Sequence, residues 1–99
     1  MISRHWRGIA KPALAQAYVE HLQSETFPAI RSLPGFVSAS ILRRTVAEGT
    51  EFLIVTQWES LDSIQAFAGH HVESAVVPQN VHEMMVDYDR VVRHHEVVE

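Results

Sequence analysis

The sequence feature that most constrains this fold is a run of four apolar residues, Phe-Leu-Ile-Val, at positions 52–55. Side chains along a β-strand point alternately to its two sides, so a strand with this run is apolar on both faces of its sheet. Apolar pairs at 36–37 and 41–42 repeat the pattern in the segment before it. We therefore expect two neighbouring central strands in a sheet that is covered on both faces.

The other segments alternate between strand and helix patterns. A helix is expected after Pro12, because proline fits the first helical turn, where its missing N–H costs nothing. Pro28 predicts a bend or a restart of that helix at residues 26–28, since it lacks a donor and crowds the preceding turn. Ser60 is the expected N-cap of a second helix, and Gly69 its end. Strands are predicted over residues 2–9, 36–45, 50–59 and 91–98, with helical turns at 72–76 and 81–88.

This order of elements is strand, helix, strand, strand, helix, strand. It predicts an α+β protein with a ferredoxin-like βαββαβ fold and a four-stranded antiparallel sheet, built as a single domain over residues 1–99. The connections place both helices on one face of the sheet. The chain has no further element for the other face, so we expect a second copy of the chain to cover it and form a homodimer.

Composition excludes several classes of function. The chain has 46% hydrophobic and 20% charged residues and a net charge of −4, a balance that does not favour nucleic-acid or membrane-surface binding. It has no cysteine, which excludes disulfides, iron–sulfur clusters and thiol chemistry. No continuous apolar run marks residues 1–8 as a signal peptide, and none approaches the roughly 20 residues of a membrane span. We therefore expect a cytoplasmic protein.

Histidine is frequent, with seven residues, and its ordinary pKa suits proton transfer near neutral pH. His94 and His95 are the candidate catalytic residues, because one of them can face a pocket from the last strand. As neighbours on a strand they point to opposite faces and cannot ligate one metal together. No His-x-His or His-x-x-x-His pair occurs, so no metal site is predicted. The alternative is that both are partly exposed strand residues.

Large side chains suggest the walls of a pocket for a small apolar or aromatic molecule. Trp6 and Trp58 offer flat apolar surfaces, Arg4 suits an anionic or quinol-like group, and Met84 and Met85 resemble a soft wall. Each has a plainer alternative: tryptophan and methionine also fill cores, and arginine also lies at the surface.

Several strings of the sequence resemble one protein family along almost the whole chain. They are HWRG (5–8), LPGF (33–36), ILRR (41–44), TQWESLDSIQAFAG (56–69) and RHHEV (93–97). In this order they are similar to the antibiotic biosynthesis monooxygenase (ABM) domain family. The resemblance implies a dimeric α/β barrel, in which two sheets face each other and each subunit holds a pocket between sheet and helices.

The same resemblance implies an oxygenase-like enzyme that acts on an aromatic or polyketide-like substrate without a metal or cofactor. The family also contains haem-degrading enzymes, which carry a tryptophan in the second helix and an axial histidine about three turns later. Aligned on Trp58, this chain has Phe67 at the tryptophan position, which makes Phe67 a pocket candidate, and Ala75 and Val76 near the histidine position. The alternatives are a non-catalytic dimeric binding module for an apolar metabolite and a haem-degrading relative.

Overall fold

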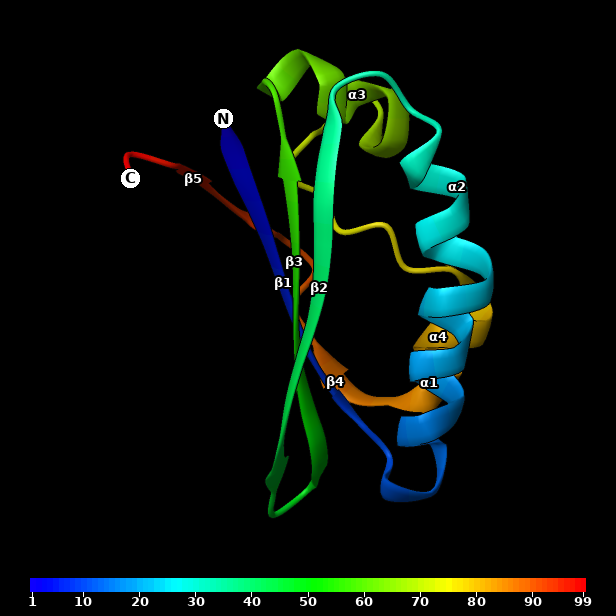
Figure 1. Ribbon diagram of the computed structural model, residues 1–99. Helices are drawn as coiled ribbons and strands as arrows, with labels where there is room; N and C mark the ends of the chain where they lie inside the picture. The colour runs from blue at the N-terminus through cyan, green and yellow to red at the C-terminus, as the bar shows by residue number, and fades with distance from the viewer.

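An antiparallel sheet forms one layer of the molecule, and the helices form a second layer on one side of it (Figure 1). This arrangement is seen in a computed structural model that describes all 99 residues. The sheet has four positions in the order β2, β3, β1 and β4, and β5 shares the outer edge of β1 with β4. The ferredoxin-like α+β fold predicted from the sequence is therefore confirmed. The strands are β1 (Ile2–Ala10), β2 (Phe36–Val46), β3 (Gly49–Trp58), β4 (Met85–Tyr88) and β5 (Arg93–Glu96).

The hairpin of β2 and β3 is the longest pairing in the sheet and follows the prediction closely. Ile41 lies opposite Ile54, and the register closes at Val46 and Gly49, so two residues form the turn. Gly49 has a positive φ of 156°, and a Cβ built there would lie 2.1 Å from the carbonyl oxygen of Ala10. Only glycine fits here, and the hairpin can close tightly against the end of β1.

The first helical segment of this layer is a series of four short helices without a loop between them (Figure 1). The Phe27 N–H bonds to the Leu22 carbonyl, five residues back, so the turn before Pro28 is widened to a π-helix. The predicted bend therefore takes the form of a wider turn, which accommodates the proline without ending the helix. The helices are η1 (Pro12–Leu14), α1 (Ala15–His21), η2 (Leu22–Thr26) and α2 (Phe27–Arg31).

The second helix, α3 (Leu61–Ala68), begins and ends where the sequence predicts. The Ser60 side chain accepts a bond from the Ser63 N–H, and the Ser63 side chain accepts one from the Ser60 N–H. This reciprocal capping satisfies N–H groups that would otherwise have no partner. Gly69 ends the helix with a φ of 77°, a conformation that glycine adopts at little cost.

The C-terminal third differs from the sequence prediction at two places. Residues 72–76 form no helix: Val72 and Glu73 lie in a turn closed by the bond from the Ser74 N–H to the His71 carbonyl at 2.9 Å, and Ser74 then pairs with Val91. The helix expected over 81–88 is α4 (Gln79–Met84), and from Met85 the chain continues as β4, so the sheet has five strands and not the four predicted. The free edge of β1 accounts for the second difference: it is nine residues long and pairs with β4 and then with β5, which is shorter than the predicted last strand.

The two faces of the sheet differ in what covers them. Phe52, Ile54 and Trp58 point to the helices and are buried, and they form the centre of the core. Leu53 and Val55 point to the opposite face, which carries no helix, and are half-buried. The apolar run therefore does point both ways, and one of its two faces is open in the single chain. None of the helices is long and apolar enough to cross a membrane.

Candidate functional site

A pocket lies between the helix-covered face of the sheet and the first helical segment, η1 to α2. Its volume is about 70 Å³, whereas a cavity for one water needs only about 10–15 Å³. Eleven of its sixteen lining residues are hydrophobic. β1 and β3 supply its floor, and helices α1 to α2 supply one wall, while residues 76–78 close the opposite side. The space therefore suits a small, largely apolar molecule.

Arg4 is the charged residue buried at the floor of this pocket. It lies on β1, is only 4% exposed, and lines the cavity. Its Nη1 donates to the Val72 carbonyl and its Nη2 to the Ser74 carbonyl at 3.0 Å. Burial lowers the pKa of Arg4 to about 10, so the side chain keeps its positive charge at neutral pH. The turn at Val72 and Glu73 and the bridge residue Ser74 thus position a buried cation.

His94 lies directly opposite Arg4 in the pairing of β1 with β5. Its Nε2 is 2.9 Å from Nη1 of Arg4. Arginine is always a donor, so Nε2 accepts and the imidazole is neutral, with its proton on Nδ1. Burial, and then the charge of Arg4, lower the pKa of His94 below its ordinary value, and this keeps the ring neutral. His94 therefore does not line the pocket, but it bonds to Arg4, which does.

Aromatic rings form much of the pocket wall. Trp6 and Tyr18 line it with their ring centres 6.0 Å apart, and Tyr18 packs edge-on against Phe52 at 4.9 Å. Burial raises the pKa of Tyr18. No side-chain hydrogen bond of the protein involves the Tyr18 hydroxyl, yet no buried polar atom is left without a partner. The hydroxyl is therefore accessible and free to donate to a ligand.

Phe67 of α3 and Thr56 of β3 complete the part of the pocket near Arg4. The guanidinium carbon of Arg4 lies 5.6 Å from the centre of the Phe67 ring, within the range of a cation–π contact. Thr56 is 5% exposed, and its Oγ1 accepts the Nε1–H of Trp58 at 2.9 Å. In that bond the Thr56 oxygen is the acceptor, so the Thr56 hydroxyl proton remains available to another acceptor.

Titratable groups around the pocket are few. His21 is the histidine among the lining residues, and its Nδ1 is 3.4 Å from the Asn80 side-chain amide. The lining contains no aspartate or glutamate. No group of three or more histidine, aspartate or glutamate side chains is placed to hold a metal ion. The polar side-chain groups of the lining are therefore a guanidinium, an imidazole and the hydroxyls of Tyr18, Thr26 and Thr56.

The structure brings some of the residues predicted from the sequence together and separates others. Arg4, Trp6 and Phe67 line the pocket, and His94 contacts Arg4. His95 is exposed on the opposite face, where its ring packs on His5 at 4.8 Å.

The remaining predicted pocket residues lie in or against the core. Trp58 is fully buried beneath Phe67, with the two rings stacked at 6.2 Å. Met85 is buried at the start of β4, and Met84 is half-buried against the core. None of these three residues lines the pocket. They support it from behind, as large apolar residues beside a cavity commonly do.

Sequence reasoning missed three parts of the lining. Thr56 is the polar member of an inward row with Phe52 and Ile54, and that break in the row is a signal that was available. Tyr18 has helical spacing with its neighbours, but spacing alone does not separate a pocket wall from a core. Residues 76–78 gave no signal, because their position depends on the pairing of Ser74 with Val91.

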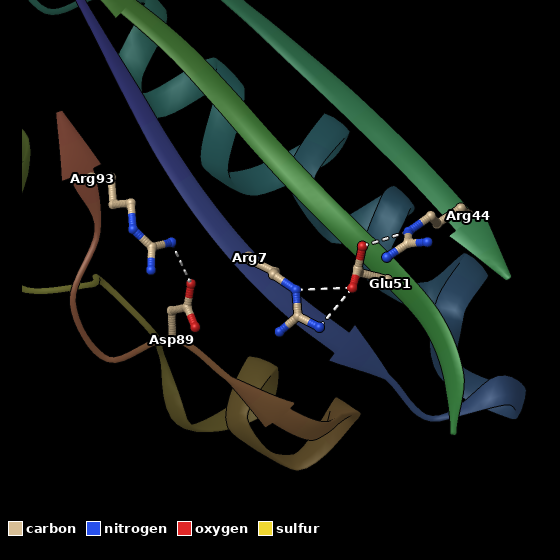
Figure 2. A network of polar contacts seen from close by, with 5 residues as sticks. All are labelled: Arg7, Arg44, Glu51, Asp89 and Arg93. Atoms are coloured by element: carbon tan, nitrogen blue, oxygen red, sulfur yellow. Dashed lines mark hydrogen bonds and ion pairs between the residues drawn. The ribbon is translucent and has the colours of Figure 1, made fainter. Parts of the chain in front are cut away.

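The open face of the sheet carries its own polar network (Figure 2). Glu51 on β3 accepts from Arg7 on β1 at 2.6 Å and from Arg44 on β2 at 2.7 Å. Arg93 and Asp89 lie near the same face at 3.8 Å. In contrast to Arg4, these arginines have carboxylate partners and exposed side chains, so they belong to a separate surface and not to the pocket.

Comparison with known proteins identifies relatives at the level of family and fold. The family model described as "Antibiotic biosynthesis monooxygenase" matches residues 1–77. No curated protein matches the sequence. A Bacillus cereus protein described as belonging to the antibiotic biosynthesis monooxygenases has 18% identity and a TM-score of 0.67, with 99% of this chain and 91% of that chain covered.

Two further solved structures have a known ligand. The haem-degrader MhuD of Mycobacterium tuberculosis, with two haems in its active site, has 24% identity and a TM-score of 0.62, with 100% and 97% covered. The monooxygenase ActVA-Orf6 of Streptomyces coelicolor, in complex with nanaomycin D, has 22% identity and a TM-score of 0.63, with 99% and 88% covered. At these identities the likeness shows the shared fold.

Proposed function

Because this chain belongs to the antibiotic biosynthesis monooxygenase family, we propose that it is an oxygenase that acts on an aromatic or polyketide-like molecule without a metal or cofactor. The observation that carries the proposal is the pair of Arg4 and His94 beside an otherwise apolar pocket. A module that merely binds an apolar metabolite gains nothing from a buried cation, whose desolvation costs free energy. Polar groups at the floor of a largely apolar pocket favour chemistry on the ligand.

The proposed reaction takes its electrons from the substrate. A phenol-type ring and O₂ give a quinone and water: one oxygen atom bonds to a ring carbon, and the other leaves with two hydrogens of the substrate. Trp6, Tyr18 and Phe67 would hold the ring flat and exclude water. The substrate proton would leave to water or to His21, the histidine that lines the pocket. His94 would act by holding Arg4, because its Nε2 is already bonded there.

Oxygen uptake tests this function. With a dihydroxynaphthalene as probe, and a chelator present, we expect uptake of one O₂ per molecule oxidised, with quinone formation that depends on the protein. Val77→Phe, which adds a ring to the pocket lining, should abolish the uptake. Val98→Phe, the same change at a residue 91% exposed, should leave it unchanged. An oxidation rate that is the same with and without protein would leave the binding module as the better description.

We also propose that the protein is a homodimer joined through the open face of its sheet. Leu42 on that face is 51% exposed, and Leu53 and Val55 beside it are half-buried. Contact between two such faces would bury these side chains and complete an α/β barrel. A chain this short buries a small share of its surface by itself, and a partner adds to that share.

The residues of the pocket do not fit a haem-degrading function well. Val76 offers no ligand atom, and Phe67 replaces a tryptophan expected from the family resemblance. His21 is the one lining residue with an imidazole, and it lies against Asn80. We expect haem titration to give no Soret band that saturates at one haem per subunit. A saturating band that disappears in His21→Ala but persists in His82→Ala would instead support the haem-degrading alternative.

A further inference from the structure

Arg4 is a buried cation for which the protein supplies no anion. The three ion pairs of the chain involve Arg7, Arg44 and Arg93, and none involves Arg4. Its hydrogen-bond partners are two carbonyl oxygens and a neutral imidazole. Removing a charge from water is costly unless an opposite charge compensates for it. A cation that is 96% buried without such compensation therefore needs an explanation, and it lines the pocket between the sheet and the helices.

The donors that face the pocket are not all used within the protein. The bonds to Val72, Ser74 and His94 occupy three of the five N–H groups of a guanidinium, and they leave Nε–H and one Nη2–H of Arg4. Every fully buried polar atom of the protein has a hydrogen-bond partner, and the Nε of Arg4 has none. This N–H is therefore accessible, and Arg4 lines the cavity. Tyr18 adds a free hydroxyl, and no carboxylate lines the space. The unused groups of Arg4 and Tyr18 can therefore donate to a ligand, and no side chain of the lining carries a negative charge that offsets the charge of Arg4.

We infer that the pocket selects ligands that carry a single anionic oxygen on a flat apolar ring, and that Arg4 is the residue that binds this oxygen. A phenolate, an enolate or a ring carboxylate has this chemistry. A phosphate does not fit as well, because its charge and several oxygens need more donors than one half-used guanidinium offers. The ring would lie against Trp6 and Phe67, and the oxygen would bond to Nε–H and Nη2–H of Arg4. The inference adds a class of substrate to the proposed function.

A matched pair of probes measures the selectivity in the wild-type protein. 2-Naphthoate carries one negative charge, and 2-naphthamide has nearly the same shape and none. Calorimetric titration should give naphthoate the lower Kd by about ten-fold or more, because charged hydrogen bonds in a water-poor site are worth more than neutral ones. Equal dissociation constants for the two probes would overturn the inference without the need for any variant.

Variants then assign the preference to Arg4. Arg4→Met keeps the apolar stem and should remove the difference between naphthoate and naphthamide. Arg4→Lys keeps the charge and should retain part of it, and it replaces Arg4→Met if the latter fails to fold. Arg93→Met is the matched control, because Arg93 is exposed and paired with Asp89 on the other side of the sheet. A preference that persists undiminished in Arg4→Met would show that another group binds the anion.

A nitrophenol probe distinguishes the phenolate from the carboxylate. At about one pH unit below the pKa of free 4-nitrophenol, most of the probe in solution is protonated and colourless. Binding to the wild type should raise the phenolate absorption band, and binding to Arg4→Met should not. A band raised equally by both proteins would contradict the assignment to Arg4. Since none of these measurements involves O₂, absence of oxygen uptake would remove the proposed oxygenase function alone.

Discussion

Arginine residues on the two faces of the sheet differ in their burial and in their partners. On the open face, Arg7 and Arg44 are exposed and share the carboxylate of Glu51 (Figure 2). On the covered face, Arg4 is buried and has no carboxylate at all. Counter-ions are thus present where water already screens charge and absent where it cannot. A buried charge to which its own protein supplies no opposite charge is the kind of group that an anionic ligand completes.

The apolar run of β3 divides between the same two faces. Phe52 and Ile54 enter the core beneath the helices, whereas Leu53 and Val55 lie on the face that no helix covers. Neighbouring residues of similar hydrophobicity therefore stabilise different things: the first pair stabilises the chain itself, and the second pair would stabilise the proposed dimer. The following predictions test this division.

The largest effect is expected from Phe52→Ala, because the ring is fully buried and packs against Tyr18. Removing it leaves a cavity and should lower the free energy of unfolding by about 3–5 kcal/mol. Urea denaturation followed by circular dichroism measures the loss. Leu53→Ala, on the open face, is the control. Measured where both variants are monomers, it should lower the free energy of unfolding clearly less than Phe52→Ala does. Equal losses at the two positions would mean that the two faces are equally buried.

The next effect concerns assembly. Leu53→Asp places a carboxylate on the open face, and in a dimer that charge would be buried without a partner, at a cost of several kcal/mol. We expect light scattering to give the wild type twice the mass of one chain, and the variant the mass of a single folded chain. Thr45→Asp, at the exposed end of β2, should remain dimeric. A wild type that is monomeric at micromolar concentration would rule out the proposed dimer.

A smaller effect is expected from acid. Burial, and then Arg4, lower the folded pKa of His94, so the unfolded chain binds the proton more readily. Stability present at neutral pH is therefore lost as the pH falls below the unfolded value of about 6.5. His5 adds to the loss, because burial and then His95 lower its pKa. Thermal melting from pH 8 to pH 5 should show the decline.

Substitutions separate the contributions of the two faces to this pH dependence. His94→Gln should reduce the decline, because its amide oxygen accepts from Arg4 and does not titrate. His95→Gln should retain most of it, because His95 is exposed and only its charge influences His5. A wild-type melting temperature that is flat from pH 8 to pH 5 would show that both histidines are solvated.

The smallest effect is expected from Glu51→Gln on the open face. Hydrogen bonds from Arg44 and then Arg7 lower the pKa of Glu51, but exposed ion pairs are screened by water and contribute little to folding. The melting temperature at neutral pH should therefore stay close to that of the wild type. Any small difference should disappear as the pH falls through the lowered pKa of Glu51, where the carboxyl group loses its charge. A large loss at neutral pH would place this network inside a buried interface.

Local sequence patterns determined most of the first two thirds of the chain. The β2–β3 hairpin, the capped start of α3 at Ser60 and its end at Gly69 all depend on residues within a few positions of one another. Their physical causes are alternation, capping and the conformational freedom of glycine, which operate before any tertiary contact forms. The sequence therefore predicted them at nearly the right residues.

The tertiary structure decided the rest, because there the competing choices differ only in long-range contacts. Met85 to Tyr88 has a helical pattern, yet it forms β4 because the edge of β1 offers hydrogen bonds to an extended backbone. Residues 73–75 pair with residues 90–92, which lie between β4 and β5, and the carbonyls at Val72 and Ser74 hold Arg4.

The candidate site shows the same limit. The sequence named Arg4, Trp6 and His94 from their chemistry and Phe67 from the family resemblance. It could not tell which side of the sheet each strand residue would face, nor that His95 would lie on the other. A strand shifted by one residue moves every side chain to the opposite face, and only the pairing of β1 with β3 and β5 fixes that choice. The residue types came from the sequence, and their meeting at one pocket came from the register of the sheet.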